Sequence, residues 1–183
     1  MESYLQSTIK LFRYYKEQAD KTMAQLEEQE LFWQYNLQSN SIATIVRHMA
    51  GNMLSRFTDF LVSDGEKDWR DRDAEFSAEP GARTALLEHW EKGWAVLLET
   101  LSLLKQDDLE KVVYIRNEGH TVIEAVNRQL AHYASHVGQI LYIGKMIKGE
   151  SWQYLSIPPN QSAQFNQQKF SQDKTRKHFT DKA

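Results

Sequence analysis

Apolar residues recur at helical spacing in four long segments of the chain, with charged and polar residues between them. The segments cover residues 4–29, 42–65, 83–104 and 121–148. In the third segment, for example, Trp90, Trp94 and Leu97 fall on one helical face. This pattern predicts an all-α fold, a four-helix bundle whose apolar faces meet in a common core.

Capping residues flank the second segment. Asn40 or Ser41 can accept the free backbone N–H groups at its start, and Gly65 suits a left-handed C-cap at its end. Only eight glycines and three prolines occur in 183 residues, which leaves few turns and agrees with long helices.

Two connectors interrupt the helical pattern. Residues 66–81 are dense in charge and show no period, and a loop of this length exceeds what antiparallel neighbours require. We therefore expect a long crossover between the second and third helices, which would then run parallel. Residues 111–115 have the composition of a short strand and residues 116–120 that of a turn, which predicts a short β-hairpin before the fourth helix.

The chain continues beyond the fourth helix. Residues 152–160 form an apolar segment that we expect to lie extended against the bundle. Residues 161–183 are rich in Gln and Lys; Phe165 and Phe170 could anchor a short helix there, and we expect the last ten residues to be frayed. The sequence thus divides into a helical domain, residues 1–159, and a polar C-terminal tail, residues 160–183.

Composition and charge narrow the classes of function. Hydrophobic residues make up 41% of the chain and charged residues 26%, so the chain can fold around a core. The net charge of −3 does not favour nucleic acid or an anionic membrane as a partner, and we expect neither. The first ten residues lack the features of a signal peptide and no apolar run approaches a membrane span, so we expect a cytoplasmic protein.

Histidines are the candidate metal ligands. The chain has no cysteine, which excludes disulfides, thiolate zinc sites and iron–sulfur clusters, and leaves His, Asp and Glu as ligands. His132 and His136 are four residues apart, so both imidazoles project from one face of the fourth helix. His48 lies in the middle of the second helix, at the edge of its apolar stripe.

A bundle can bring these three side chains together. Three neutral imidazoles from two helices would leave coordination positions open, as in catalytic zinc sites. The alternative is that His132 and His136 are surface or bundle-edge residues and that His48 is a partly buried core residue.

Other site classes are absent from the sequence. A ferritin-like di-iron site needs a glutamate three residues before each helix histidine, and Gln129 and Tyr133 occupy those positions. The chain has no His-Glu-x-x-His motif, no glycine-rich phosphate loop and no Gly-x-Ser-x-Gly elbow. We interpret His89, His120 and His178 as structural or exposed residues.

An acidic run lies in the crossover. Residues 68–75 contain four carboxylates, but the spacing and central glycine of an EF-hand are missing. We interpret the run as a solvated loop with Trp69 and Phe76 as anchors.

Together these features resemble the DinB-like (YfiT-like) four-helix metal proteins of bacteria. The shared features are a histidine in mid helix two, a long crossover, a short strand and turn, and His-x-x-x-His followed by Val-Gly-Gln-Ile at residues 137–140. Residues 51–57 and 65–76 resemble one uncharacterised subfamily of that group, and the resemblance covers about residues 1–159.

The resemblance implies a metal site and a chemistry. The three ligands of the family map onto His48, His132 and His136, which would bind a divalent ion such as zinc or nickel. It also implies a homodimer, a small-molecule substrate and, as in characterised relatives, transfer or isomerisation that uses a low-molecular-weight thiol such as bacillithiol or mycothiol.

Three functions remain open from the sequence. The first is a metal-dependent thiol S-transferase, in which the ion binds the sulfur of the cosubstrate and lowers its pKa for attack on an electrophile. The second is a metal-dependent hydrolase that activates water. The third is a non-catalytic stress protein that binds a metal or a small ligand. The resemblance favours the first, whereas the thiol-binding and substrate-binding residues are not indicated.

Overall fold

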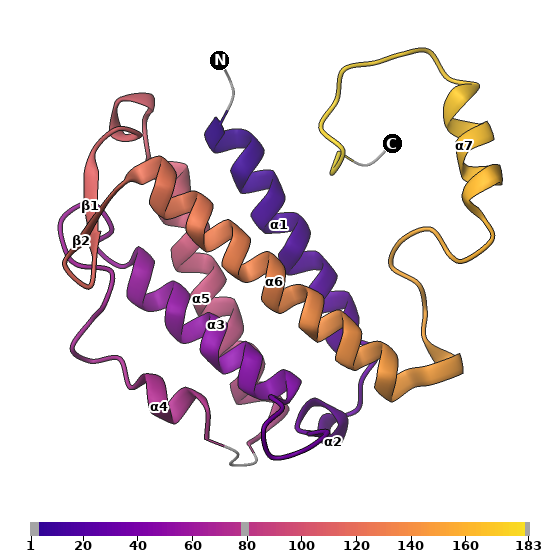
Figure 1. Cartoon of the computed structure of the whole chain (residues 1–183), viewed down its shortest axis with the longest axis horizontal. Helices are drawn as coiled ribbons and strands as arrows, with labels where there is room; N and C mark the ends of the chain where they lie inside the picture. Colours follow the sequence, from indigo (N-terminus) through magenta and orange to yellow (C-terminus); the bar gives the residue numbers. More distant parts are fainter. Residues whose placement is uncertain (1–3, 78–80, 182–183) are drawn as a thin grey trace.

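Four long helices form a bundle in the computed structural model of the chain, which describes residues 4–77 and 81–181. They are α1 (Tyr4–Met23), α3 (Ile42–Phe57), α5 (Arg83–Leu103) and α6 (Val122–Lys148). The shorter elements are α2 (Glu28–Leu31), α4 (Arg72–Glu75), η1 (Gln106–Asp108), β1 (Val112–Ile115), β2 (Glu118–Thr121), η2 (Gly149–Ser151) and α7 (Ser162–Phe170). The predicted all-α four-helix bundle is confirmed (Figure 1).

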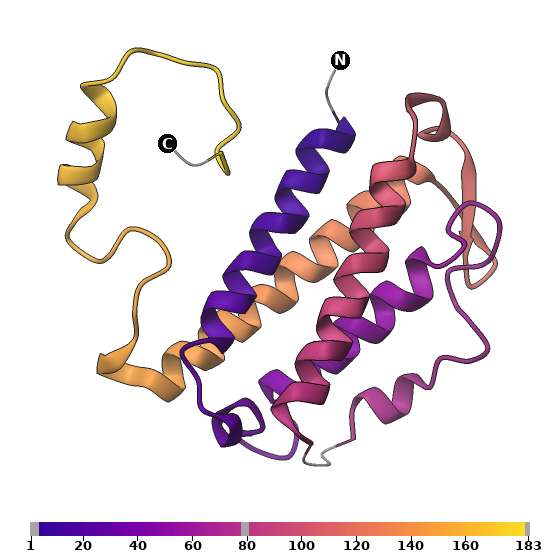
Figure 2. The same cartoon turned by 180° about the vertical axis from the view of Figure 1, so that it is seen from behind.

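The four helices form two parallel pairs. α3 and α5 lie side by side and point the same way, while α1 and α6 run together in the opposite direction (Figures 1 and 2). The segment between α3 and α5 therefore returns the chain to the other end of the bundle, as predicted for the crossover. Gly93 permits the close contact of α3 with α5, because a Cβ there would lie 2.9 Å from the Cα atom of Ala50.

Aromatic side chains fill the centre of the bundle. Trp90, Trp94, Phe12 and Tyr133 are fully buried and come from α5, α1 and α6. The Trp94 ring lies 5.3 Å from that of Trp90, 6.3 Å from Phe12 and 6.1 Å from Tyr133, measured between centroids, in edge-to-face contacts. These contacts fix the position of α6 along the bundle axis relative to α5 and α1.

The first two predicted helices end earlier than the sequence suggests. α1 ends at Met23 rather than at residue 29, and the Arg83 guanidinium donates to the carbonyl oxygens of Met23 and Leu26 at 2.8 and 2.7 Å. A side chain from α5 thus satisfies carbonyl groups that the helix leaves free. α3 begins after its Ser41 N-cap, as predicted, and ends at Phe57, before a turn in which Asp59 has a φ of 51°.

Gly65 has a role other than the predicted helix cap. It does not adopt the left-handed conformation, and its N–H donates to the carbonyl oxygen of Tyr114 at 2.8 Å. A Cβ at this position would lie 3.0 Å from Arg56 and 3.2 Å from Ile115. The prediction of a left-handed cap was wrong because the glycine serves a tertiary contact between the crossover and the hairpin.

The predicted hairpin is confirmed. β1 pairs antiparallel with β2, with Ile115 opposite Glu118. Arg116 and Asn117 form the two-residue turn with φ values of 56° and 62°, and both backbone N–H groups donate to the Asp64 carboxylate at 2.8 Å. The crossover therefore holds the hairpin turn in place.

The C-terminal tail only partly follows the prediction. Trp152 is 8% exposed and packs on the bundle, whereas Phe165 and Phe170 on α7 are 39% and 83% exposed and do not anchor that helix. The tail end contacts α1, where Lys10 pairs with Asp181 at 2.8 Å. Fraying of the last ten residues stays a prediction, and residues 182 and 183 lie outside the described residues.

Within residues 4–77 and 81–181, no helix combines the length and hydropathy that crossing a membrane requires.

Candidate metal centre

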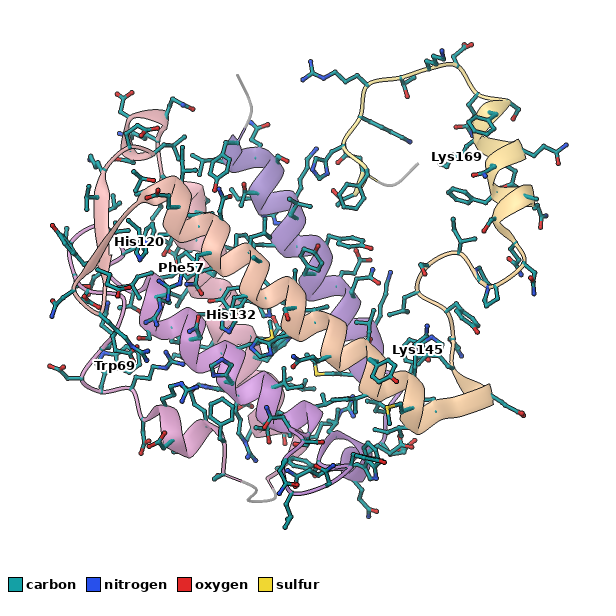
Figure 3. The ribbon with its side chains drawn as sticks, viewed as in Figure 1. Phe57, Trp69, His120, His132, Lys145 and Lys169 are labelled. Atoms are coloured by element: carbon teal, nitrogen blue, oxygen red, sulfur yellow. The ribbon has the colours of Figure 1, made fainter. Side chains whose placement is uncertain are left out.

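The three predicted metal ligands converge between two helices. His48 belongs to α3, and His132 and His136 belong to adjacent turns of α6. Figure 3 shows His132 on α6, in the middle of the bundle. The Nε2 atom of His132 lies 3.3 Å from that of His48 and 3.0 Å from that of His136. One ring nitrogen from each residue falls within 4.8 Å of the other two, so a single ion could contact all three.

The surroundings of two of the rings favour the neutral imidazole. Burial, the neighbouring histidines and Arg56 and Arg70 together lower the pKa of His132 from 6.5 to about 4. Burial also lowers the pKa of His136, against the opposing effect of a hydrogen bond with Gln139. Neutral rings at neutral pH keep a nitrogen lone pair available for a metal ion.

Glu75 orients the His48 ring. His48 Nδ1 lies 3.0 Å from Glu75 Oε2, and a carboxylate can only accept, so Nδ1 carries the proton and Nε2 presents its lone pair to the other histidines. Arg70 holds the same carboxylate with Nε and Nη2 at 2.8 and 2.9 Å. Burial raises the pKa of Glu75, but the hydrogen bonds from His48 and Arg70 outweigh burial and lower it below its usual value.

This arrangement corrects the interpretation of the acidic run. Glu75 is 8% exposed, at the end of the short helix α4, and it contacts the histidine cluster instead of solvent. Of the two predicted anchors, Phe76 packs on the His48 ring at 4.9 Å between centroids, while Trp69 is 60% exposed. Gly51 makes room for the carboxylate, since a Cβ there would lie 2.2 Å from Glu75 Oε1.

Nδ1 of His136 lies 3.1 Å from Gln139 Oε1, so a second ring of the cluster also has an orienting partner.

Two other histidines lie outside the cluster. His120 contacts Arg128 and His178 contacts Ser7, both at 3.1 Å between the nearest side-chain nitrogen or oxygen atoms. Both lie outside the histidine cluster, and their interpretation as structural or exposed residues stays a prediction.

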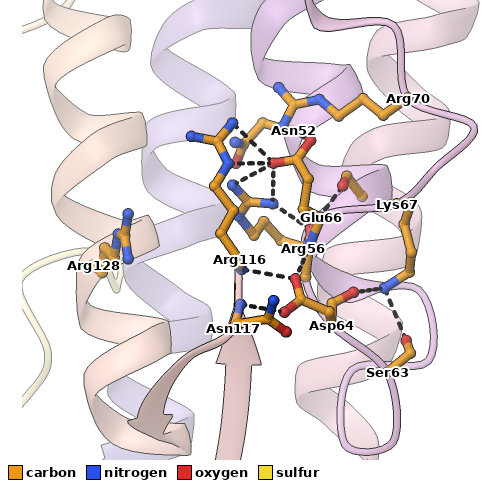
Figure 4. Close-up of polar contacts among 12 residues, drawn as sticks. Asn52, Arg56, Ser63, Asp64, Glu66, Lys67, Arg70, Arg116, Asn117 and Arg128 are labelled. Atoms are coloured by element: carbon orange, nitrogen blue, oxygen red, sulfur yellow. Dashed lines mark hydrogen bonds and ion pairs between the residues drawn. The ribbon is translucent and has the colours of Figure 1, made fainter.

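A cavity of about 270 Å³ adjoins the histidine cluster. Its lining consists of His48, Asn52, Arg56, Arg70, Arg72, Arg116, Arg128, Gln129 and His132. Tyr133 Oη donates to the Asn52 side-chain oxygen at 2.8 Å, which ties the cavity wall to the aromatic core. Sequence patterns do not indicate that arginines from α3, the crossover, the hairpin turn and α6 line one cavity. Figure 4 shows one arginine from each of these four segments.

The donor set fits a divalent transition-metal ion. Imidazole nitrogens suit zinc, nickel and copper, and the carboxylate behind His48 is the outer partner that metal-binding histidines usually have. The convergence of three ring nitrogens and this second layer of contacts could together hold such an ion.

The chain belongs to the family described as "Protein of unknown function (DUF1572)", whose model matches residues 1–161. The match spans the three histidines, Glu75 and the arginines of the cavity. The comparisons with curated proteins and with solved structures gave no match.

Proposed function

We propose that this member of the DUF1572 family binds a divalent ion, zinc or nickel, through His48, His132 and His136 and acts as a metal-dependent thiol S-transferase. The observation that carries the proposal is the convergence of one ring nitrogen from each histidine within 4.8 Å. The resemblance to DinB-like proteins, in which low-molecular-weight thiols are cosubstrates, supplies the reaction class. A homodimer, also implied by that resemblance, stays a prediction.

The residues of the chain would position the reactants. Glu75 and Arg70 fix the His48 ring, and Gln139 does the same for His136. A divalent ion held there would supply a Lewis acid that lowers the pKa of a thiol, so that a thiolate is present at neutral pH. The adjoining cavity, whose lining includes His48 and His132, would receive the electrophile.

The lining of the cavity favours thiol transfer over hydrolysis. Hydrolytic zinc sites commonly use a carboxylate as general base beside the metal-bound water. No Asp or Glu is among the described lining residues, and Glu75, the carboxylate that contacts the histidine cluster, is bonded to His48 and Arg70. A thiol that is already ionised does not need such a base.

The test begins with the metal content of the full chain purified without an affinity tag. Protein loaded with zinc or nickel is then mixed with bacillithiol, mycothiol or another cellular thiol and with a panel of electrophiles, and S-conjugates are measured by mass spectrometry. We expect conjugate formation above the background rate and its loss when the metal is removed.

The matched variants are His132→Ala and His178→Ala. The first removes a ligand and should abolish metal binding and transfer, whereas the second removes a tail histidine and should leave both unchanged. Loaded protein that gives no rate above background with any thiol would refute the transferase, and turnover without added thiol would replace it with the hydrolase.

A further inference from the structure

The cavity beside the three histidines carries an excess of positive charge. Its lining contains five guanidinium groups, those of Arg56, Arg70, Arg72, Arg116 and Arg128, and no carboxylate among the described residues. Guanidinium groups are the side chains that best match carboxylate and phosphate, because they offer planar pairs of N–H donors.

Nearby carboxylates compensate only part of this charge. Glu66 pairs with Arg56 at 3.2 Å and with Arg116 at 3.0 Å (Figure 4). Glu75 pairs with Arg70 at 2.8 Å. The carboxylate of Asp64 also lies nearby, but it accepts hydrogen bonds from backbone N–H groups of the hairpin turn. Of the five guanidinium groups, those of Arg56, Arg70 and Arg116 therefore have a carboxylate partner among the described residues.

The uncompensated charge lies on Arg72 and Arg128. Neither forms an ion pair with a carboxylate in the described part of the chain; Arg72 lies over the Phe76 ring at 4.9 Å, and Arg128 contacts His120 at 3.1 Å. Figure 4 shows Arg128 on its own helix, apart from the arginines gathered round Glu66. Both side chains are exposed, so an incoming anion can reach them.

Two buried polar atoms of the lining lack a partner. Arg56 Nε and Gln129 Oε1 make no hydrogen bond with any described residue, although Arg56 is 6% exposed and Gln129 is 4% exposed. Buried polar atoms are almost always paired in folded proteins. One is a donor and the other an acceptor, so a molecule with an anionic oxygen and a hydroxyl or amine could satisfy both.

The geometry points to an oxyanion subsite: the cavity binds the carboxylate or phosphate group of a small molecule beside the three histidines. Arg72 and Arg128 supply the free positive charge, Arg56 Nε donates a hydrogen bond, and Gln129 Oε1 accepts one. A volume of about 270 Å³ suits a metabolite of a few carbon atoms, since cavities for drug-sized ligands begin at about 300 Å³. Anion binding at this cavity does not depend on the proposed function. Only the further step, that the bound anion is the substrate of the transferase, rests on that function.

Calorimetric titration of the full-length, metal-free chain tests the subsite. The probes are succinate, inorganic phosphate and, as an uncharged analogue, succinamide, at low and high salt. We expect saturable binding of at least one anion, no binding of succinamide, and weaker binding as ionic strength rises. The stronger of the two anions identifies the group that the cavity prefers.

Variants locate the binding. Arg72→Gln and Arg128→Gln should each weaken anion binding roughly tenfold, the scale of one charge-assisted hydrogen bond. Glu66→Gln removes a compensating charge and should strengthen binding. Arg13→Gln is the matched control, because it removes an exposed arginine of α1 that does not line the cavity, and should have no effect.

Two results would overturn the subsite: no saturable binding of either anion, or equal weakening in the Arg13, Arg72 and Arg128 variants. His136→Ala separates the subsite from the proposed function, because His136 belongs to the histidine cluster but not to the cavity lining. Anion binding that survives in this variant supports the subsite whether or not the protein binds a metal. Thiol transfer by a wild-type chain that binds no anion would refute the subsite alone.

Discussion

Replacement of Glu75 tests the second layer of the candidate metal centre. Its carboxylate is 8% exposed and accepts one hydrogen bond from His48 at 3.0 Å and two from Arg70 at 2.8 and 2.9 Å. Glu75→Gln preserves the shape of the side chain and removes its charge. His48 then loses the charged partner that fixes its ring and its tautomer.

Two magnitudes follow from these contacts. Loss of an outer partner of a metal-binding histidine lowers metal affinity about 10–100-fold, or about 1.4–2.7 kcal/mol. In the metal-free protein, loss of one member of a buried ion pair lowers the free energy of unfolding by about 3–5 kcal/mol. We expect the lower end of that range, because the Glu66 carboxylate lies 3.7 Å from Arg70 and still compensates part of its charge.

Competition with a chromophoric chelator measures zinc affinity, and urea unfolding of the metal-free chain measures stability. The matched control is Asp73→Asn, which removes an exposed carboxylate from the same short helix, α4, and should change neither quantity. A Glu75→Gln protein that folds and binds zinc as tightly as the wild type would refute the role assigned to Glu75. The same conclusion would follow if Asp73→Asn weakened zinc binding equally.

Four further substitutions test the packing and the charges around the site. Gly51→Ala places a Cβ 2.2 Å from Glu75 Oε1 and should weaken zinc binding in the chelator assay, although alanine favours the helix. Gly93→Ala forces α3 and α5 apart and should cost about 1–3 kcal/mol in urea unfolding, whereas Gly138→Ala, with no atom within 4 Å of its Cβ, should gain about 0.5–1 kcal/mol; equal effects would contradict both expectations. Burial raises the pKa of Asp64, but hydrogen bonds from three backbone N–H groups lower it below its usual value, so this carboxylate stabilises the fold above its unfolded-state pKa and loses that effect as pH falls through the folded-state pKa. The difference in unfolding free energy between the wild type and Asp64→Asn should therefore shrink below about pH 4, and a difference independent of pH would refute this explanation.

The sequence predicted those parts of the site that follow from helical periodicity. His132 and His136 share a face because four residues make about one helical turn, and His48 occupies the edge of an apolar stripe that must face the bundle. Once α3 and α6 pack, these positions can meet. The helix assignments and the expectation of a bundle were therefore enough to predict that the three histidines converge.

The rest of the site could not be predicted in this way. Glu75 lies in a segment without periodicity, and its burial depends on Arg70 and on the space above Gly51, neither of which has a local signature. The same holds for Gly65, whose contact with the hairpin joins residues far apart in the chain. A pattern of single residues identifies helix faces, but it does not show which loop side chain reaches them.

The crossover joins the two halves of the site. Arg70 bonds to Glu75, which orients His48, and it also lies 3.7 Å from Glu66, which pairs with Arg56 in the cavity wall. A substitution of Arg70 would therefore disturb the candidate metal ligands and the oxyanion subsite together, and could not separate their roles. Arg128 lies outside this series of ion pairs, so its replacement alters the charge of the cavity and leaves the support of the histidines intact. Replacement of Arg128 therefore tests the cavity alone, whereas Arg70 supports both halves of the site.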